Sequence, residues 1–210
     1  MRGDRENPGR EKETGRIEAF SDGVFGIAIT LLILEIKVPQ VADLAGKTTL
    51  AAALLRQWPS YLSYLTSFLT VLIMWINHHR LFRHIHRSDD NFLLLNGLLL
   101  MAVTIVPFPT AVLSGWILIE GSTAAALYSG TYVAIAVLFN IVWRYAAGNG
   151  RLLADNHDRA AVEAISAQYR YGPLWYVLAF LLAFVSVMAS VGLCAGLAVY
   201  FALPHRHRKK

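Results

Sequence analysis

Residues 16–38, RIEAFSDGVFGIAITLLILEIKV, decide the fold of this chain. The run is long enough to cross a bilayer, since a transmembrane helix needs about 20 mostly apolar residues. It nevertheless carries Arg16, Ser21 and Asp22 near its start. A charge at the centre of a membrane span costs about 2.5–3.5 kcal/mol or more, so such a group is a functional-site hypothesis by default. We therefore expect this first span to hold the functional site and the other spans to support it.

The composition indicates a membrane protein with several spans. Of the 210 residues, 56% are hydrophobic and only 16% are charged, and the mean hydropathy is +0.46. A soluble domain has about 45–50% apolar and about 25% charged residues. The net charge of +5 does not indicate a nucleic-acid partner, because the basic residues cluster between and beyond the apolar runs. The single cysteine, Cys194, provides neither a disulfide framework nor a metal site.

We predict an all-α membrane protein with six transmembrane helices. Four apolar runs each have the length of one span: 17–38, 58–78, 91–116 and 123–144. The last apolar block is too long for one span and has small and polar residues in its middle, so we divide it into short helices over 172–186 and 189–203, joined by a hairpin. Pro107 and Pro109 could kink the third span. Helices are also expected in the outer connection 39–57 and over AVEAISAQYR in the inner loop 145–170.

The distribution of basic residues predicts the orientation. Sixteen of the 19 Lys and Arg lie on the side of the N-terminus, and only Lys37, Lys47 and Arg56 lie on the other. Because cytosolic segments carry the excess of positive charge, both termini are expected in the cytosol of a multi-pass cell-membrane protein. We expect a disordered cytosolic tail over 1–15, a transmembrane domain over 16–203 and a basic cytosolic tail over 204–210.

The first span has two different faces. At 100° per residue, Gly23, Ile27, Thr30, Leu31 and Leu34 fall on one stripe about 100° wide, and the adjoining Asp22 points well away from it. By itself, a stripe of branched aliphatic residues is typical of packing against neighbouring helices.

Polar residues of three spans are expected at the depth of Asp22. The second span ends with Trp75, His78 and His79, and the third begins with Asn96 close by. An intramembrane carboxylate needs such partners. We predict a buried network that joins Arg16, Ser21 and Asp22 to Trp75, to His78 or His79, and to Asn96. Such a network fixes helix packing; ion coordination or a proton relay is the alternative.

These motifs resemble a known family. The string Arg16-x-x-x-Phe20-Ser21-Asp22, followed by GVFGIAITLLILEI, closely resembles the transmembrane-protein-175 potassium channels in their single-repeat prokaryotic form. The WINHHRLF end of the second span, Asn96 followed by VPFPT, and the short final hairpin extend the resemblance over about residues 16–203.

The resemblance implies a homotetramer in the lipid bilayer, with the first helix of each subunit lining a central pore. It implies a constriction made by Ile27, Leu31 and Leu34, potassium preference at Thr30, and an anchoring role for Arg16 and for the Phe20-Ser21-Asp22 motif. Potassium and other monovalent cations would be the permeant ions, with no cofactor and no bound metal.

A pore of this kind would work by hydrophobic gating. The sequence has no TVGYG filter, and rings of Ile and Leu close by dewetting and open by widening. Glu35 lies beside the stripe near the expected outer mouth, where four carboxylates would concentrate cations. Alternatively, Glu35 is an interfacial residue that pairs with Lys37.

Two other functions are open from the residues alone. The segment 78–86, HHRLFRHIH, holds four of the seven histidines. Imidazoles at such spacings can chelate zinc or iron, as in a membrane di-iron enzyme. That class needs several separate histidine boxes, however, and outside the basic tail only His157 lies elsewhere. We therefore expect no enzyme here. A proton-conducting or proton-coupled protein that uses Asp22 and a histidine of the second span is the alternative function.

Overall fold

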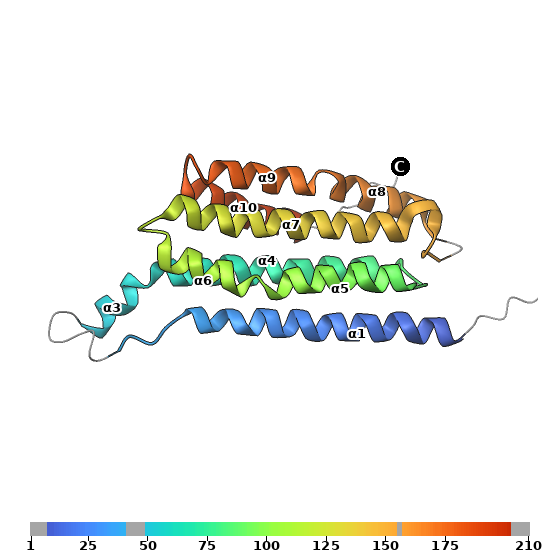
Figure 1. The fold of residues 1–210 in the computed structure, drawn as a ribbon, viewed down its shortest axis with the longest axis horizontal. Helices are drawn as coiled ribbons and strands as arrows, with labels where there is room; N and C mark the ends of the chain where they lie inside the picture. The colour runs from blue at the N-terminus through green and yellow to red at the C-terminus, as the bar shows by residue number, and fades with distance from the viewer. Residues whose placement is uncertain (1–7, 41–48, 155–156, 203–210) are drawn as a thin grey trace, which may run out of the picture.

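The computed structural model describes residues 8–40, 49–154 and 157–202, with side chains from residue 14 onward. This part of the chain is a helical bundle whose elements run along one long axis (Figure 1). The helices are α1 (Pro8–Leu31), η1 (Leu32–Glu35), α3 (Leu50–Arg56), α4 (Trp58–Phe82), α5 (Asp90–Thr104), α6 (Pro107–Trp116), α7 (Gly121–Ala147), η2 (Gly148–Gly150), α8 (Arg159–Arg170), α9 (Gly172–Leu182) and α10 (Val187–Ala202). α1 forms one edge of the bundle, α4, α5 and α6 form the middle, and α7, α9 and α10 form the opposite side.

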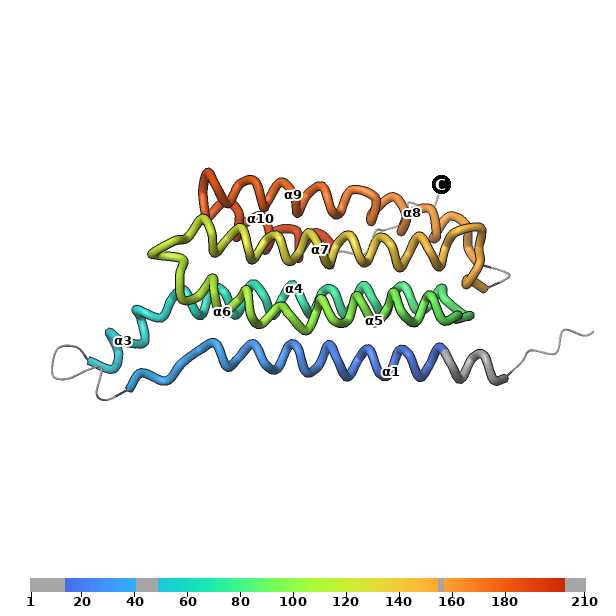
Figure 2. Tube along the Cα trace, in the orientation of Figure 1, coloured from blue at the N-terminus to red at the C-terminus, as the bar shows by residue number. Residues whose placement is uncertain are grey.

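Four segments are long and apolar enough to cross a membrane, as predicted. They are Thr14–Glu35, Trp58–Phe82, Asp90–Trp116 and Gly121–Gly150. The last apolar block forms two shorter helices, α9 with 11 residues and α10 with 16, which the chain joins by a tight reversal (Figure 2). At 1.5 Å per residue these helices are about 16 Å and about 24 Å long, shorter than a hydrocarbon core of about 30 Å. The hairpin is confirmed, with α9 ending four residues earlier than predicted.

α1 extends further toward the N-terminus than the sequence predicts. The helix begins at Pro8, so residues 8–15, predicted to be disordered, are helical. Proline fits the first turn of a helix, and the Glu–Lys–Glu run at 11–13 favours helix. Residues 1–7 of the predicted N-terminal tail and the whole predicted C-terminal tail, 204–210, lie outside the described residues, as does residue 203.

The two prolines of the third span interrupt it where the sequence predicts. α5 ends at Thr104 and α6 begins at Pro107, because neither Pro107 nor Pro109 has an N–H to continue the helical bonding. Just beyond the break, the Thr110 hydroxyl is hydrogen-bonded to Ser67 of α4 at 2.7 Å. This buried contact joins α4 to α6 beside the break.

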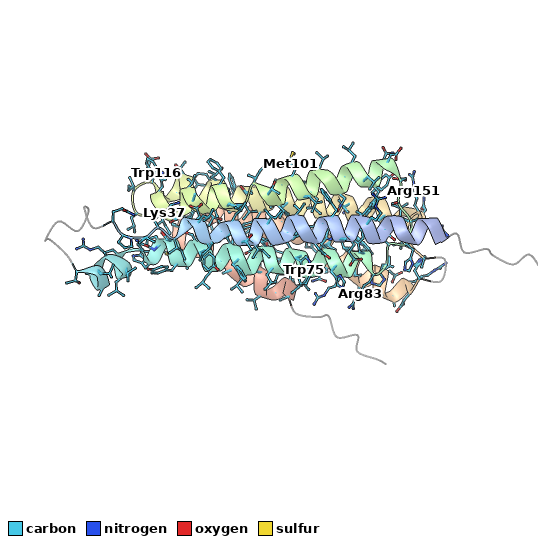
Figure 3. All side chains as sticks on the ribbon, turned by 90° about the horizontal axis from the view of Figure 1, so that it is seen from below. Lys37, Trp75, Arg83, Met101, Trp116 and Arg151 are labelled. Carbon is cyan, nitrogen blue, oxygen red and sulfur yellow. The ribbon has the colours of Figure 1, made fainter. Side chains whose placement is uncertain are left out.

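One end of the bundle is closed by its two loops. The α4–α5 loop pairs with the segment after η2, where Ile85 and Leu153 form an isolated bridge. Asn149 adopts a positive φ of 54° in the turn that precedes the bridge. Figure 3 shows Arg83 and Arg151 at this end of the molecule, and Lys37 and Trp116 at the other. The predicted helices in the two connections are confirmed as α3, which precedes the second span, and α8, which covers 159–170.

Candidate functional site

The face of α1 that points into the protein is buried and combines one polar residue with apolar ones. Ser21, Phe25, Ala28 and, in η1, Leu32 are all buried, at the i, i+4, i+7 and i+11 positions of one helical stripe. α1 packs on α4 and α5. This packing determines which residues α1 presents outward.

The outward face of α1 carries the predicted stripe. Ile27 is 59% exposed, Leu31 42% and Leu34 58%, and Thr30 is exposed between them. The other described helices of the chain therefore do not cover the stripe, although such a stripe usually packs against neighbouring helices. The Thr30 hydroxyl donates to the carbonyl oxygen of Ile27 at 2.9 Å. Its oxygen lone pairs remain able to accept a hydrogen bond or to contact a cation.

A chain of three hydrogen bonds anchors α1 to α4 and α5. The Nδ2 of Asn96 donates to the Ser21 hydroxyl at 3.1 Å, and Ser21 donates to the Ile17 carbonyl oxygen at 2.8 Å. The Oδ1 of Asn96 lies 2.9 Å from the Nε2 of His78. Because the Asn96 oxygen can only accept, Nε2 is the donor and carries the proton. All three side chains are buried, so the structure brings together the predicted residues Ser21, His78 and Asn96.

Two further contacts join α1 to α4. The Trp75 indole N–H donates to the Oδ1 of Asp22 at 2.8 Å. His79 Nδ1 lies 2.6 Å from the Oε1 of Glu18. Neither histidine pairs with Asp22, so the predicted histidine partner of Asp22 is wrong. The sequence reading missed Glu18, although it lies one helical turn before Asp22 just as His79 lies one turn after Trp75, and that matched spacing could have found it.

Arg16 and Phe20 are not part of these contacts. Both are exposed and line a groove of about 500 Å³ between α1 and α5, together with Asp90 and Leu93. Phe20 is 68% exposed, so it does not anchor α1 within one chain. Among the described residues, no hydrogen bond or ion pair joins Arg16 to Asp22. The single network predicted from the sequence is therefore three separate contacts without Arg16, because Arg16 and Asp22 leave α1 in different directions.

Glu35 ends η1 and is partly exposed. The predicted alternative partner, Lys37, instead donates from Nζ to the backbone carbonyl of Leu34 at 2.7 Å. No ion pair joins Glu35 to Lys37 in the part of the chain that the structure describes. Glu35 thus lies just beyond Leu34, at the end of the open stripe.

The histidines of 78–86 point to different surroundings. His78 bonds Asn96, His79 bonds Glu18, and His84 meets the Trp143 ring edge-on at 6.3 Å. Burial lowers the pKa of His84, which favours its neutral form. Over the described ranges, no group of three His, Cys, Asp or Glu side chains is placed to hold a metal ion.

Four segments that can span a bilayer, and a first span with one anchored polar face and one open apolar face, define a polytopic membrane protein. The chain belongs to the TMEM175 family. The family model described as "Endosomal/lysosomal potassium channel TMEM175" matches residues 16–107. A protein of Chamaesiphon minutus named a potassium channel is 55% identical over 196 residues, which cover 92% of this chain and 95% of that one. The family is one of ion channels, so the enzyme alternative is wrong.

Solved structures agree with this assignment. The crystal structure of a lysosomal potassium-selective channel TMEM175 homolog from Chamaesiphon minutus has a TM-score of 0.84, with 53% sequence identity, and the match covers 91% of this chain and 97% of that one. A bovine relative is named an endosomal/lysosomal proton channel; it is 46% identical over 97 residues, which are 44% of this chain and only 20% of the bovine protein.

Proposed function

We propose that this protein is a potassium-preferring cation channel whose pore is lined by α1. The relative from Chamaesiphon minutus that matches over nearly its whole length is named a potassium channel, and the solved TMEM175 homolog from the same organism is titled potassium-selective. The observation that carries the proposal is the open stripe: Ile27, Leu31 and Leu34 face outward while the opposite face of α1 is fixed by hydrogen bonds. A helix anchored in this way holds its stripe in one direction.

The gate follows from the chemistry of the stripe. Rings of Ile27, Leu31 and Leu34 offer an ion nothing to replace its water, so a narrow ring dewets and blocks conduction. Potassium gives up water more readily than sodium, which favours potassium in such a neck. Thr30 adds one hydroxyl per subunit between these rings. Since its proton is donated to the Ile27 carbonyl, its oxygen is free to face a cation.

We propose a homotetramer as the working form. α1 lies at the edge of the bundle (Figure 1), where copies of the chain can bring their α1 helices together. The groove between α1 and α5 carries Arg16 and Phe20 on one side and Asp90 on the other. Charges of both signs on one groove allow a neighbouring copy to pair with it, and Phe20 then becomes buried between subunits instead of within one.

The proposed subunit has six membrane-crossing helices, with α9 and α10 as the two short ones, and residues 16–203 as its channel domain. The helices α9 and α10 are both apolar and are joined by a reversal. Together they return the chain to the side from which α9 starts. Arg83 and Arg151 lie at the end of the bundle where α1 begins (Figure 3), which supports cytosolic termini by the positive-inside rule. The segments 1–15 and 204–210 are proposed as cytosolic tails.

The test is potassium flux from proteoliposomes with the Ile27→Ala variant. Removing the side chain widens the narrowest ring, so flux should rise several-fold and the preference for potassium over sodium should fall. The matched control is Ile33→Ala, since Ile33 is also exposed but lies in η1 between the stripe residues and not on the stripe. Unchanged flux in Ile27→Ala, or equal effects of the two variants, would contradict the proposed gate.

Proton conduction is the second candidate function. It is favoured by the name of the bovine relative and by the close contact of Glu18 with His79 between α1 and α4. The same liposomes under a proton gradient, with a pH-sensitive dye inside, separate the two. Proton flux that Glu18→Gln abolishes while potassium flux persists would support a proton path through this pair.

A further inference from the structure

A second pocket lies away from α1, between the end of α4 and the face of α8. Its volume is about 220 Å³. α4 and the residues just after it contribute Asn77, Arg80, Leu81, Arg83 and His84, and α8 contributes Ala161, Ala164, Ile165, Gln168 and Tyr169. Figure 3 shows Arg83 at the basic end of the bundle, at its edge. The pocket therefore lies where the second span ends.

The sequence of α8 explains why the pocket is open. Ala161, Ala164 and Gln168 are spaced i, i+3 and i+7, so they share one helical face, and the two alanines leave room in front of α4. A hydrogen bond ties α8 to α7: the Trp143 indole N–H donates to the Ser166 hydroxyl at 2.9 Å. Packing against α7 therefore keeps α8 from closing onto α4.

The pocket is lined by basic groups and by no carboxylate among its lining residues. Arg80 is fixed, because it donates to the backbone carbonyls of Phe201 and Ala202 at 3.4 and 3.1 Å and so caps the end of α10. Arg83 is exposed and has no ion-pair partner within the described residues. The carboxylate of Asp158 accepts from the backbone N–H groups at the start of α8.

One residue that lines the pocket carries an unmet hydrogen-bond donor. The side-chain nitrogen of Gln168 is buried and has no partner in the structure. Buried polar groups in folded proteins nearly always have a partner, so an orphaned donor indicates an acceptor that the structure does not hold. Together with the two guanidinium groups, the acceptor that fits is an anion with several oxygens, which arginine recognises through paired N–H donors.

We propose that the pocket between α4 and α8 binds a phosphate group, held by Arg83 and Gln168 and by the positive field of Arg80. The phosphate belongs either to an anionic lipid headgroup or to free phosphate. The position at the end of a span is where headgroup phosphates lie, and basic pockets at this level attract anionic lipids. The bound group would join the end of the second span to α8. This inference depends on the membrane location and not on ion selectivity.

The experiment is native mass spectrometry of the detergent-purified full chain with phosphatidic acid or phosphatidylethanolamine added. The wild-type protein should retain phosphatidic acid preferentially. Arg83→Gln should lower that retention about fivefold to tenfold, and Gln168→Met, which keeps the length but removes the donor, should lower it several-fold. The matched control is Arg159→Gln, which removes the same charge from α8 outside the pocket and should change retention less than about twofold.

A parallel thermal-stability titration with inorganic phosphate distinguishes the source. A rise in Tm with phosphate that Arg83→Gln removes, without preferential retention of phosphatidic acid, assigns the site to free phosphate and still supports the proposal. Elution volume and potassium flux report whether each variant folds. If Arg83→Gln does not fold, the binding measured for Gln168→Met tests the proposal. Equal behaviour of Arg83→Gln and Arg159→Gln toward both probes would overturn the proposal.

Discussion

Trp75 donates its indole N–H to Asp22 at 2.8 Å, and one turn further along α4, His79 meets Glu18 at 2.6 Å. Each step of four residues forward on α4 corresponds to four residues backward on α1, as antiparallel helices in a fixed register require. These two contacts, one helical turn apart, prevent α1 from rotating about its own axis. The direction of Ile27, Leu31 and Leu34 is thus set by polar contacts on the opposite face of the same helix.

Replacing Trp75 with Phe should destabilise the protein. The change leaves the Asp22 carboxylate without its donor, and a hydrogen bond to a charged group contributes about 1.5–3 kcal/mol. We expect a lower Tm in a detergent melt followed by size-exclusion chromatography. Trp175→Phe is the control, since Trp175 is exposed on α9 and its change should have little effect. Equal Tm values for the two variants would contradict a stabilising role for the hydrogen bond between Trp75 and Asp22.

Replacing Asn96, which removes the buried hydrogen bonds to Ser21 and His78, should lower the free energy of unfolding more than removing an exposed hydroxyl from the same helix. Asn96→Leu leaves the His78 Nε2–H without an acceptor and the Ser21 hydroxyl without a donor, at about 1–3 kcal/mol for each buried group. Adding Ser21→Ala to it should cost less than the sum of the single changes, because both remove the same bond. The control is Thr104→Val, an exposed hydroxyl of α5. Strict additivity of the two changes in a double-mutant cycle would contradict the hydrogen bond between Ser21 and Asn96.

Asp89 should give the protein a pH-dependent contribution to stability. Partial burial alone would raise the pKa of Asp89, but the backbone N–H of Phe92, the Tyr145 hydroxyl and Arg151 together lower it below 3.8, its ordinary value. The ionised form therefore stabilises the folded protein above that value, and the contribution is lost as the pH falls through the lowered folded pKa. Asp89→Asn should have a lower Tm than the wild type at neutral pH.

The gap in Tm should stay constant well above pH 3.8 and shrink as the pH falls below it. It should close once the pH is below the lowered folded pKa, because there Asp89 is protonated in both folded and unfolded chains. Asp90→Asn is the control, as Asp90 is the exposed neighbour at the first position of α5. A gap that persists in strong acid would show that the interaction does not depend on the charge of Asp89.

Thr30→Val should reduce the preference for potassium over sodium without blocking flux. Valine keeps the shape of the side chain but removes the oxygen that would replace water around the ion. Bi-ionic flux measurements in liposomes should give a potassium-to-sodium ratio that moves toward one. Thr131→Val is matched to it, because that partly exposed threonine of α7 also donates to a backbone carbonyl of its own helix. A ratio that changes equally in both variants would remove Thr30 from the pore.

Glu35→Gln should lower potassium flux only at low salt. Carboxylates near a pore mouth raise the local cation concentration, and screening removes that effect as the Debye length falls from about 30 Å at 0.01 M to about 3 Å at 1 M. We expect a several-fold loss at the low concentration and almost none at the high one. Glu120→Gln changes an exposed carboxylate in the α6–α7 connection and serves as the control. A loss that is independent of salt would point to a structural role for Glu35.

The sequence alone determined the four long spans and the break in the third. A run of about 20 apolar residues can satisfy its backbone groups in a bilayer only as a helix, so the four long spans followed from composition. The prolines at 107 and 109 placed the break between α5 and α6, since proline has no N–H to donate. Helical periodicity also placed Ile27, Leu31 and Leu34 on one side of α1, because that angle depends only on their spacing.

The tertiary structure decided which residues face which. Periodicity fixes positions around one helix but not the rotation of that helix against its neighbours, so the sequence could not tell that Asp22 meets Trp75, that His79 meets Glu18, or that Arg16 turns to the groove instead. The same freedom left open whether the stripe of α1 is covered. The packing of α1 on α4 and α5 decides it: Ser21 turns inward, where Asn96 supplies the partner that a buried hydroxyl needs, and Ile27 and Leu31 on the other side stay exposed.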